Sequence, residues 1–154
     1  QLVFGEQIGW LGPDAVRRAE NFAFLRQAIH LRWNLRRYFY AGEMARPPRL
    51  VGAVPRVTAD WQWHNEWPVT TDQVLCGAWR LPREGRMVLL FVNVGDTPVT
   101  ARVDYDLRAY GFAKPAVRAT RLTAEGRSES LDLTPKIDRS VTFAPGIAWA
   151  WEVK

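Results

Sequence analysis

The chain has almost none of the residues from which disulfide frameworks and zinc sites are built. Its 154 residues include one cysteine, Cys76, and two histidines, His30 and His64. A single cysteine excludes a disulfide within the chain, and neither histidine has a second histidine or a cysteine at ligand spacing. We therefore expect no metal and no cofactor. We interpret Cys76, which lies in the apolar run 74–78, as an inert buried thiol.

Long apolar runs and lysine are also scarce. No stretch approaches the roughly 18 uninterrupted apolar residues of a membrane-spanning helix, so we expect no membrane contact. The formal charge of +5 is carried by 18 arginines and three lysines, which are scattered along the chain rather than gathered in a stripe. No nucleic-acid motif accompanies them, and we expect no nucleic-acid partner. Arginine packs its stem on apolar surface while its head forms ion pairs, which predicts a structural role for most of them.

Apolar and aromatic residues, in contrast, are abundant. The apolar fraction is 47% and there are eight tryptophans, a composition typical of a packed globular chain and not of disorder. The character of the sequence changes at Pro47-Pro48, because a helical pattern precedes these prolines and every later apolar segment has the pattern of a strand. We therefore predict two units, residues 1–48 and residues 49–154.

The first unit is predicted to hold one strand and one long helix. Leu2-Val3-Phe4 is a continuous apolar triplet, as in a strand buried on both faces. A helix is expected from about residue 21 to residue 41, ended by Gly42. Its apolar residues form two neighbouring stripes, more than an isolated surface helix needs, so we expect it to be covered on two sides. The first stripe is Phe24, Ala28, Leu31, Leu35 and Phe39, and the second is Phe22, Leu25, Ile29 and Trp33.

The second unit has the pattern of an antiparallel β-sandwich. Both alternate sets of residues 86–94 are apolar, which predicts a central strand. Residues 99–105 alternate between apolar and polar, which predicts one buried and one solvated face. About seven or eight short strands separated by turn residues describe a sandwich. The further candidates are residues 56–59, 61–67, 74–79, 117–122, 130–133, 140–143 and 147–153.

The order of these elements resembles the C-terminal region of TIM-barrel glycoside hydrolases. The resemblance is carried by a strand ending in Phe4-Gly5-Glu6-Gln7, a helix ending in residues 38–44, and Arg46-Pro47-Pro48 before a β-domain. Residues 86–100 and the turn Ala144-Pro145-Gly146 also look like parts of such sandwiches. The resemblance implies a mostly β fold, in which the last strand and helix of a truncated (β/α)8 barrel precede an antiparallel β-sandwich.

The resemblance also implies a parent protein that hydrolyses glycosidic bonds. The chain opens on Gln1 without a methionine, and we expect it to be the C-terminal piece of that longer protein. Its expected partners are a carbohydrate and the upstream barrel domain of the same protein. The catalytic strands of such barrels lie earlier in the chain, so we expect the isolated piece to be inactive, because an open barrel has no closed site.

Glu6 is the candidate catalytic residue. Active sites of TIM barrels lie where the strands end in their C-terminal loops, and glycoside hydrolysis needs two carboxylates. If residues 2–4 form the last barrel strand, Glu6 and Gln7 lie at that mouth. Glu6 is then one of the carboxylates or a ligand of a sugar hydroxyl, and Gln7 and Trp10 bind substrate, Trp10 by stacking on a sugar ring. The alternative is a loop glutamate that pairs with an arginine.

The second candidate site is a tryptophan-rich segment, residues 60–67. Trp61 and Trp63 share a face if this segment is one strand, and with Trp67 they offer indole rings beside polar groups that suit sugar hydroxyls. The alternative, which we favour, is that these tryptophans pack the sandwich against the helix and the barrel. The alternative function is accordingly a carbohydrate-binding or protein-interaction β-sandwich module without a catalytic role.

Overall fold

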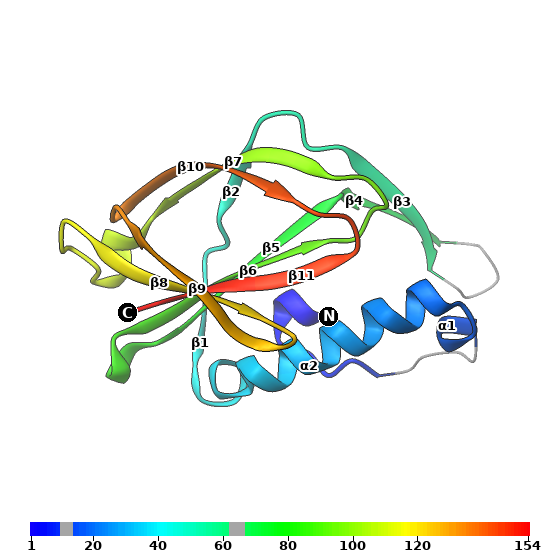
Figure 1. Ribbon diagram of the computed structural model, residues 1–154, viewed down its shortest axis with the longest axis horizontal. Helices are drawn as coiled ribbons and strands as arrows, with labels where there is room; N and C mark the ends of the chain where they lie inside the picture. Colours follow the sequence, from blue (N-terminus) through cyan, green and yellow to red (C-terminus); the bar gives the residue numbers. More distant parts are fainter. Residues whose placement is uncertain (10–13, 62–66) are drawn as a thin grey trace.

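The computed structural model describes residues 1–9, 14–61 and 67–154. It is mostly β, with antiparallel sheets preceded by one long helix, which confirms the predicted fold class. Figure 1 shows two layers of strands above that helix. The helical elements are η1 (Leu2–Phe4), α1 (Asp14–Arg17), α2 (Ala19–Ala41), η2 (Pro82–Glu84) and η3 (Leu107–Tyr110), where η marks a short 3₁₀ turn.

The described strands form a large sheet, a small sheet and a separate ribbon. The large sheet has six strands in the order β1-β5-β6-β11-β8-β9, the small sheet has the order β10-β7-β2, and β3 pairs with β4. Every pairing is antiparallel, as in a sandwich. The strands are β1 (Glu43–Ala45), β2 (Arg49–Val51), β3 (Arg56–Trp61), β4 (Trp67–Asp72), β5 (Val74–Leu81), β6 (Arg86–Asn93), β7 (Val99–Asp106), β8 (Val117–Thr123), β9 (Gly126–Leu133), β10 (Lys136–Phe143) and β11 (Ile147–Val153).

β6 is the central strand that its sequence predicts. It lies between β5 and β11, and its apolar residues are buried on both faces of the sheet. Met87, Leu89 and Phe91 belong to the core between the two sheets. The alternate residues Val88, Leu90 and Val92 belong to a second core between the large sheet and the helix. A strand with two buried faces needs apolar residues at every position, which the sequence provides.

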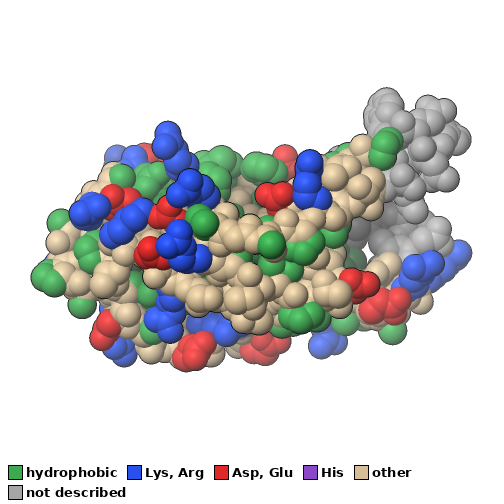
Figure 2. Space-filling model, turned by 90° about the horizontal axis from the view of Figure 1, so that it is seen from above, with side chains coloured by type: hydrophobic (Ala, Val, Ile, Leu, Met, Phe, Trp, Pro, Cys, Tyr) green, Lys and Arg blue, Asp and Glu red, His purple; other side chains and the backbone are tan. Residues whose placement is uncertain are grey.

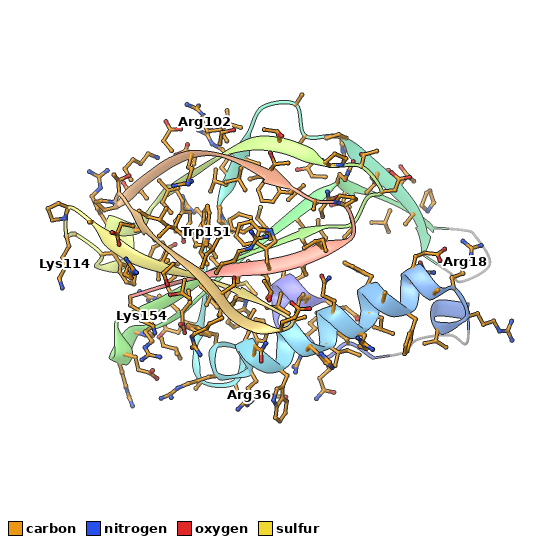
Figure 3. The ribbon with its side chains drawn as sticks, viewed as in Figure 1. Arg18, Arg36, Arg102, Lys114, Trp151 and Lys154 are labelled. Atoms are coloured by element: carbon orange, nitrogen blue, oxygen red, sulfur yellow. The ribbon has the colours of Figure 1, made fainter. Side chains whose placement is uncertain are left out.

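The core between the sheets is dominated by aromatic rings. The Phe91 ring centroid lies 4.8 Å from that of Trp149, 5.4 Å from that of Phe143 and 5.5 Å from that of Trp151. Such tilted and edge-on contacts stabilise a core beyond the apolar area that they bury. Figure 3 shows Trp151 in the space between the two sheets. This layer holds the sandwich together without a contribution from the helix.

The long helix α2 covers the opposite face of the large sheet with one of its two stripes. Ala28, Leu31 and Leu35 of the predicted first stripe are buried there, and Phe24 and Phe39 are partly buried. The other side of the helix is exposed, so the expected cover on two sides is found on one side within the described residues. The exposed fractions are 48% for Phe22, 44% for Ile29, 64% for Trp33 and 69% for Tyr40, and we call these four residues the outer stripe.

Residues 2–4 form the 3₁₀ turn η1, so the prediction of a buried strand here is wrong. The Phe4 amide donates to the Gln1 carbonyl and the Gly5 amide to the Leu2 carbonyl, each over 3.1 Å. η1 lies on the outer face of the large sheet, against β5 and β6. Leu2 and Val3 are buried, which explains two of the three apolar residues, whereas Phe4 is 61% exposed. A triplet is too short to separate a strand from a buried turn.

Gly77 lets η1 lie close to the sheet. A Cβ atom at this position of β5 would lie 2.7 Å from the Val3 carbonyl oxygen, so a larger residue would push the turn away. The Trp79 indole donates to the same carbonyl over 3.1 Å. The N-terminal turn is therefore fixed to β5 by a backbone contact and a side-chain hydrogen bond.

Gly42 alone separates α2 from the first strand of the large sheet. Its φ is −101°, so it is not left-handed, and it is needed because a Cβ atom would lie 2.4 Å from the Tyr38 carbonyl oxygen. Glu43 then enters β1 opposite Arg80, and the two side chains form an ion pair of 2.7 Å. Residues 43–45 are not among the strands that the sequence predicts.

The outer face of the small sheet is polar. Arg49 and Lys136 both pair with Asp104, and Arg102 pairs with Asp138. Figure 2, which looks onto this side of the molecule, shows basic and acidic side chains interspersed. The residues between them, Val99 to Tyr105 in alternation, point inward and are buried, as the pattern predicts. No helix in the described part of the chain is long and apolar enough to cross a membrane.

Candidate functional site

Glu6 lies in the exposed segment that follows η1, and its backbone is attached to α2. The Nε atom of Arg32 donates to the Glu6 carbonyl over 2.9 Å, and another guanidinium nitrogen donates to the Gly5 carbonyl over 3.3 Å. The side chains of Glu6 and Gln7 are exposed. Arg32 therefore contacts the main chain of residues 5 and 6.

The η1 turn removes the geometric reason for placing Glu6 at a barrel mouth. That argument needed residues 2–4 to be a strand with Glu6 at its C-terminal end. Glu6 instead follows a turn that packs on β5 and β6. It remains an exposed carboxylate on a fixed backbone, which suits a ligand contact better than a buried acid.

The tryptophan-rich segment is divided between two strands. Trp61 is the last residue of β3, Trp67 is the first residue of β4, and the two are opposite one another in the ladder. The prediction of a single strand over residues 61–67 is therefore wrong for its ends. Trp63, like Trp10, lies outside the described residues. The ribbon is joined by a 2.8 Å hydrogen bond between the Thr58 and Thr70 hydroxyls.

An apolar cavity of about 340 Å³ lies between the N-terminal segment, the first half of α2 and the large sheet. This volume is within the range of small-molecule sites. Its walls are almost wholly apolar, so it offers space for an apolar group but no acid, base or nucleophile. Sequence reasoning did not find it, because its walls come from three distant segments. They are Leu2, Val3, Ile8, Phe24, Leu25, Ala28, Leu75, Val92 and Val94, with Gln1 and Asn21.

The second half of α2 is joined to the sheet by a buried carboxylate, Glu152 of β11, whose side chain is 2% exposed. The Tyr38 hydroxyl donates to it over 3.0 Å, and Arg127 donates to both of its oxygens over 3.1 to 3.2 Å. Lys154 lies 3.3 Å away. A buried charge is tolerated when it is paired and hydrogen-bonded in this way.

The hydrogen bonds keep Glu152 charged. Burial raises its pKa, but the bonds from Tyr38 and Arg127 outweigh burial and hold the pKa below its usual value. Burial, reinforced by the Glu152 charge, raises the pKa of the Tyr38 phenol, which therefore stays a donor. This pair fixes α2 on the sheet and is not poised for proton transfer. Glu152 was missed, although it is the one charged residue in the apolar run 147–153.

A second cavity, of about 480 Å³, opens beside this carboxylate. It lies between the second half of α2 and the ends of β6, β8, β9 and β11. Four arginines line it, Arg36, Arg37, Arg86 and Arg127, and we call it the arginine-lined cavity. Four positive side chains around one cavity make it suited to an anion rather than to a neutral or cationic group.

The thiol of Cys76 is not activated. Burial, with a smaller contribution from the Asp72 carboxylate, raises the pKa of the Cys76 thiol to about 12. The thiol is therefore protonated at neutral pH and is a poor nucleophile. Among the described residues, no three His, Cys, Asp or Glu side chains gather into a metal-binding group.

Comparison with known proteins finds solved structures with similar regions, but no match among protein families or curated proteins. No protein-family model matches the chain, and no curated protein matches it. Solved structures with similar regions include a GH30 endoxylanase from Clostridium papyrosolvens, with 10% identity over 52% of this chain and a TM-score of 0.37. A GH51 α-L-arabinofuranosidase from Thermotoga petrophila has 13% identity over 66% of this chain and a TM-score of 0.39. An arabinofuranosidase structure has 15% identity over 68% and a TM-score of 0.38.

These neighbours are glycoside hydrolases, and the match to each is partial. The chain spans about a fifth to a quarter of their length, 20%, 24% and 25% respectively. Likeness at this level of identity and superposition does not carry an activity from those proteins to this chain.

Proposed function

We propose that this chain is the accessory C-terminal region of a glycoside hydrolase-like protein, and that α2 and the sandwich pack against an upstream barrel domain. Residues 1–48 are then the part nearest that domain, and residues 49–154 are the accessory sandwich. The observation that carries the proposal is the outer stripe of α2. A barrel strand at residues 2–4 is not part of the proposal, because η1 is a 3₁₀ turn.

The outer stripe has the arrangement of an interface. Phe22, Ile29, Trp33 and Tyr40 are seven, four and seven residues apart, which aligns them along one side of the helix. At 1.5 Å per residue the stripe extends for about 27 Å. All four side chains are exposed by 44% or more. Large contiguous apolar patches on soluble proteins mark interaction sites, and aromatic residues are enriched in them.

The docking test uses the upstream region of the same gene, produced as a separate protein. We expect a one-to-one complex with this chain by isothermal titration calorimetry and loss of that complex in the double variant Ile29→Asp/Trp33→Asp. The matched control is Val69→Asp, which alters an apolar residue of β4 that is 46% exposed. Unchanged binding of the double variant would remove the outer stripe from the interface.

Glu6, Gln7 and Trp10 are proposed to contact the sugar in the assembled protein. The support for Glu6 is its exposed carboxylate on a backbone that Arg32 fixes to α2. In the intact protein, Glu6→Gln is expected mainly to raise KM if the carboxylate binds a hydroxyl. A fall in kcat by orders of magnitude would instead assign it to catalysis. Unchanged kinetics would remove Glu6 from the site.

The alternative function is a carbohydrate-binding module that uses Trp61, Trp63 and Trp67. The observation in its favour is that β3 and β4 form a ribbon separate from both sheets, with Trp61 opposite Trp67. Tryptophan fluorescence during titration with neutral oligosaccharides tests this function. Quenching that disappears in Trp61→Ala and Trp67→Ala would support it, and an unchanged spectrum would leave the tryptophans a packing role.

A further inference from the structure

The arginine-lined cavity holds more positive charge than its carboxylates neutralise. Glu152 is already compensated by Arg127 and Lys154. Glu84 is 2.7 Å from Arg37 and 3.9 Å from Arg86. With Arg36, five cationic groups therefore lie in or beside the cavity with two carboxylates. Figure 3 shows that these groups come from different layers, Arg36 from the helix and Lys154 from the end of the sheet.

Within residues 1–9, 14–61 and 67–154, two of these guanidinium groups have donors without acceptors. Arg86 lies 3.9 Å from its nearest carboxylate oxygen, which is beyond hydrogen-bond distance, and its guanidinium makes no hydrogen bond to another described residue. Arg36 stacks on the Trp33 ring at 4.3 Å and donates one hydrogen bond, of 2.8 Å, to the Trp33 carbonyl. Stacking holds the Arg36 fork in place and leaves its other donors available.

The floor of the cavity does not compete for these donors. Both Glu152 oxygens already accept hydrogen bonds, from Tyr38 and from Arg127. The Tyr38 hydroxyl is used as a donor to Glu152. The Glu152 carboxylate therefore already has its hydrogen bonds. The donors that are still available belong to the arginines that line the cavity.

We infer that the arginine-lined cavity binds a small multivalent oxyanion, with Arg86 and Arg36 as its main ligands and Arg37 at the rim. The guanidinium fork matches two oxygens of a carboxylate, phosphate or sulfate group, and such charge-assisted bonds are among the strongest in proteins. A neutral sugar would leave the positive charge uncompensated. The inference does not rest on the proposed function. None of these arginines belongs to the sugar site, although Arg36 stacks on Trp33 of the outer stripe.

Binding would join the helix to the sheet, since Arg36 lies on α2 and Arg86 on β6. A ligand that binds the folded chain and not the unfolded chain raises Tm as its concentration increases. The test is differential scanning calorimetry with inorganic phosphate and with citrate, each at constant ionic strength set by sodium chloride. We expect Tm to rise with one or both anions. Calorimetric titration at constant temperature gives the dissociation constant.

The matched comparison uses two double variants that each remove two positive charges. Arg36→Gln/Arg86→Gln is expected to weaken binding about tenfold or more, as expected for lost hydrogen bonds to a charged ligand. Arg102→Gln/Arg118→Gln, which alters two exposed ion pairs elsewhere on the sandwich, is expected to keep the wild-type affinity. The single variant Arg36→Gln provides the test if the first double variant does not fold, because Arg36 is exposed.

The two anions separate the sources of the oxyanion. A response to phosphate alone assigns a tetrahedral oxyanion, and a response to citrate alone assigns a polycarboxylate. The inference is overturned if neither anion raises Tm or gives a titration signal. It is also overturned if both double variants lose affinity equally, because the effect would then be that of net charge.

Discussion

The two faces of the large sheet are built in different ways from alternate residues of the same strands. In β11, Trp149 and Trp151 point toward the small sheet, whereas Ala148, Ala150 and Glu152 point toward α2. Large rings fill the gap between two sheets, which lie about 10 Å apart. Small side chains let a helix lie close to the other face. The inner face is therefore filled mainly by aromatic rings, and the outer face packs against the helix and η1.

The features described above as candidate sites or interfaces lie mainly on one side of the large sheet. The two cavities described above, the buried carboxylate and the outer stripe of α2 are on the helix side of the large sheet. The other side of the sandwich presents paired charges to solvent. Variants that separate the two faces are therefore the most informative experiments.

Phe91→Ala should be the most destabilising change, because Phe91 contacts three aromatic rings in the inner core and is fully buried. We expect a loss of about 3–5 kcal/mol in the free energy of unfolding, measured by urea denaturation. The same substitution at Phe4, which is 61% exposed, should change stability by less than about 0.5 kcal/mol. A comparable loss at both positions would contradict the aromatic core.

Leu31→Ala tests the layer between α2 and the sheet. Leu31 is fully buried there, but one helix can shift to fill part of the space. We expect a loss of about 2–3 kcal/mol, at the lower end of the range for buried leucine. Ile29→Ala, two residues away in the outer stripe, is the control and should cost much less. If Ile29→Ala costs as much as Leu31→Ala, the helix faces have been assigned wrongly.

Glu152→Gln tests the polar contact on the outer face. At neutral pH we expect a loss of about 1–3 kcal/mol, since Tyr38 and Arg127 lose a charged acceptor. The folded pKa of Glu152 is lowered, so its stabilisation is present above the unfolded pKa of about 4.3 and is lost as pH falls through the folded pKa. The difference between wild type and variant should therefore shrink in acid.

The control for this pH dependence is Glu129→Gln. Glu129 forms an exposed ion pair with Arg121, and such pairs contribute little. Its denaturation midpoints should follow those of the wild type from pH 7 to pH 3. A constant Glu152→Gln difference over that range would show that the carboxylate charge does not stabilise the contact.

Ile29→Ser/Trp33→Ser should have the smallest effect on folding and a clear effect on association. Both residues are exposed, so each substitution should change stability by less than about 0.5 kcal/mol. We expect the wild-type chain to self-associate through the outer stripe in sedimentation velocity and the double variant to be more monomeric. Val69→Ser is the control. A wild-type chain that stays monomeric at high concentration would contradict self-association through the outer stripe.

Periodicity predicted the long elements well. The alternation in β7, the doubly apolar β6 and the end strand at residues 147–153 gave the right elements, and α2 begins two residues before the predicted start. The secondary-structure predictions failed where the local pattern is short. The triplet of η1 fits a turn or a strand equally, and Glu43–Ala45 has no alternation to announce β1.

The candidate sites were less predictable, because they depend on contacts between distant residues. Glu152 meets Tyr38, 114 positions earlier, and Arg127, 25 positions earlier. No local spacing in the sequence predicts these contacts. A single acidic residue in an apolar strand nevertheless indicates a buried carboxylate that needs a partner. Arg86 and Arg36 are likewise 50 positions apart in the sequence, and only the fold brings them to the same cavity. Glu6, Gln7 and the tryptophan residues stay predictions.

The direct connection at Gly42 couples the position of α2 to that of the large sheet. No loop separates α2 from β1, and the Gly42 amide is still bonded to the Tyr38 carbonyl while the next residue enters the sheet. A displacement of the C-terminal end of α2 would therefore be transmitted directly to the edge strand β1, and from there to its partner β5.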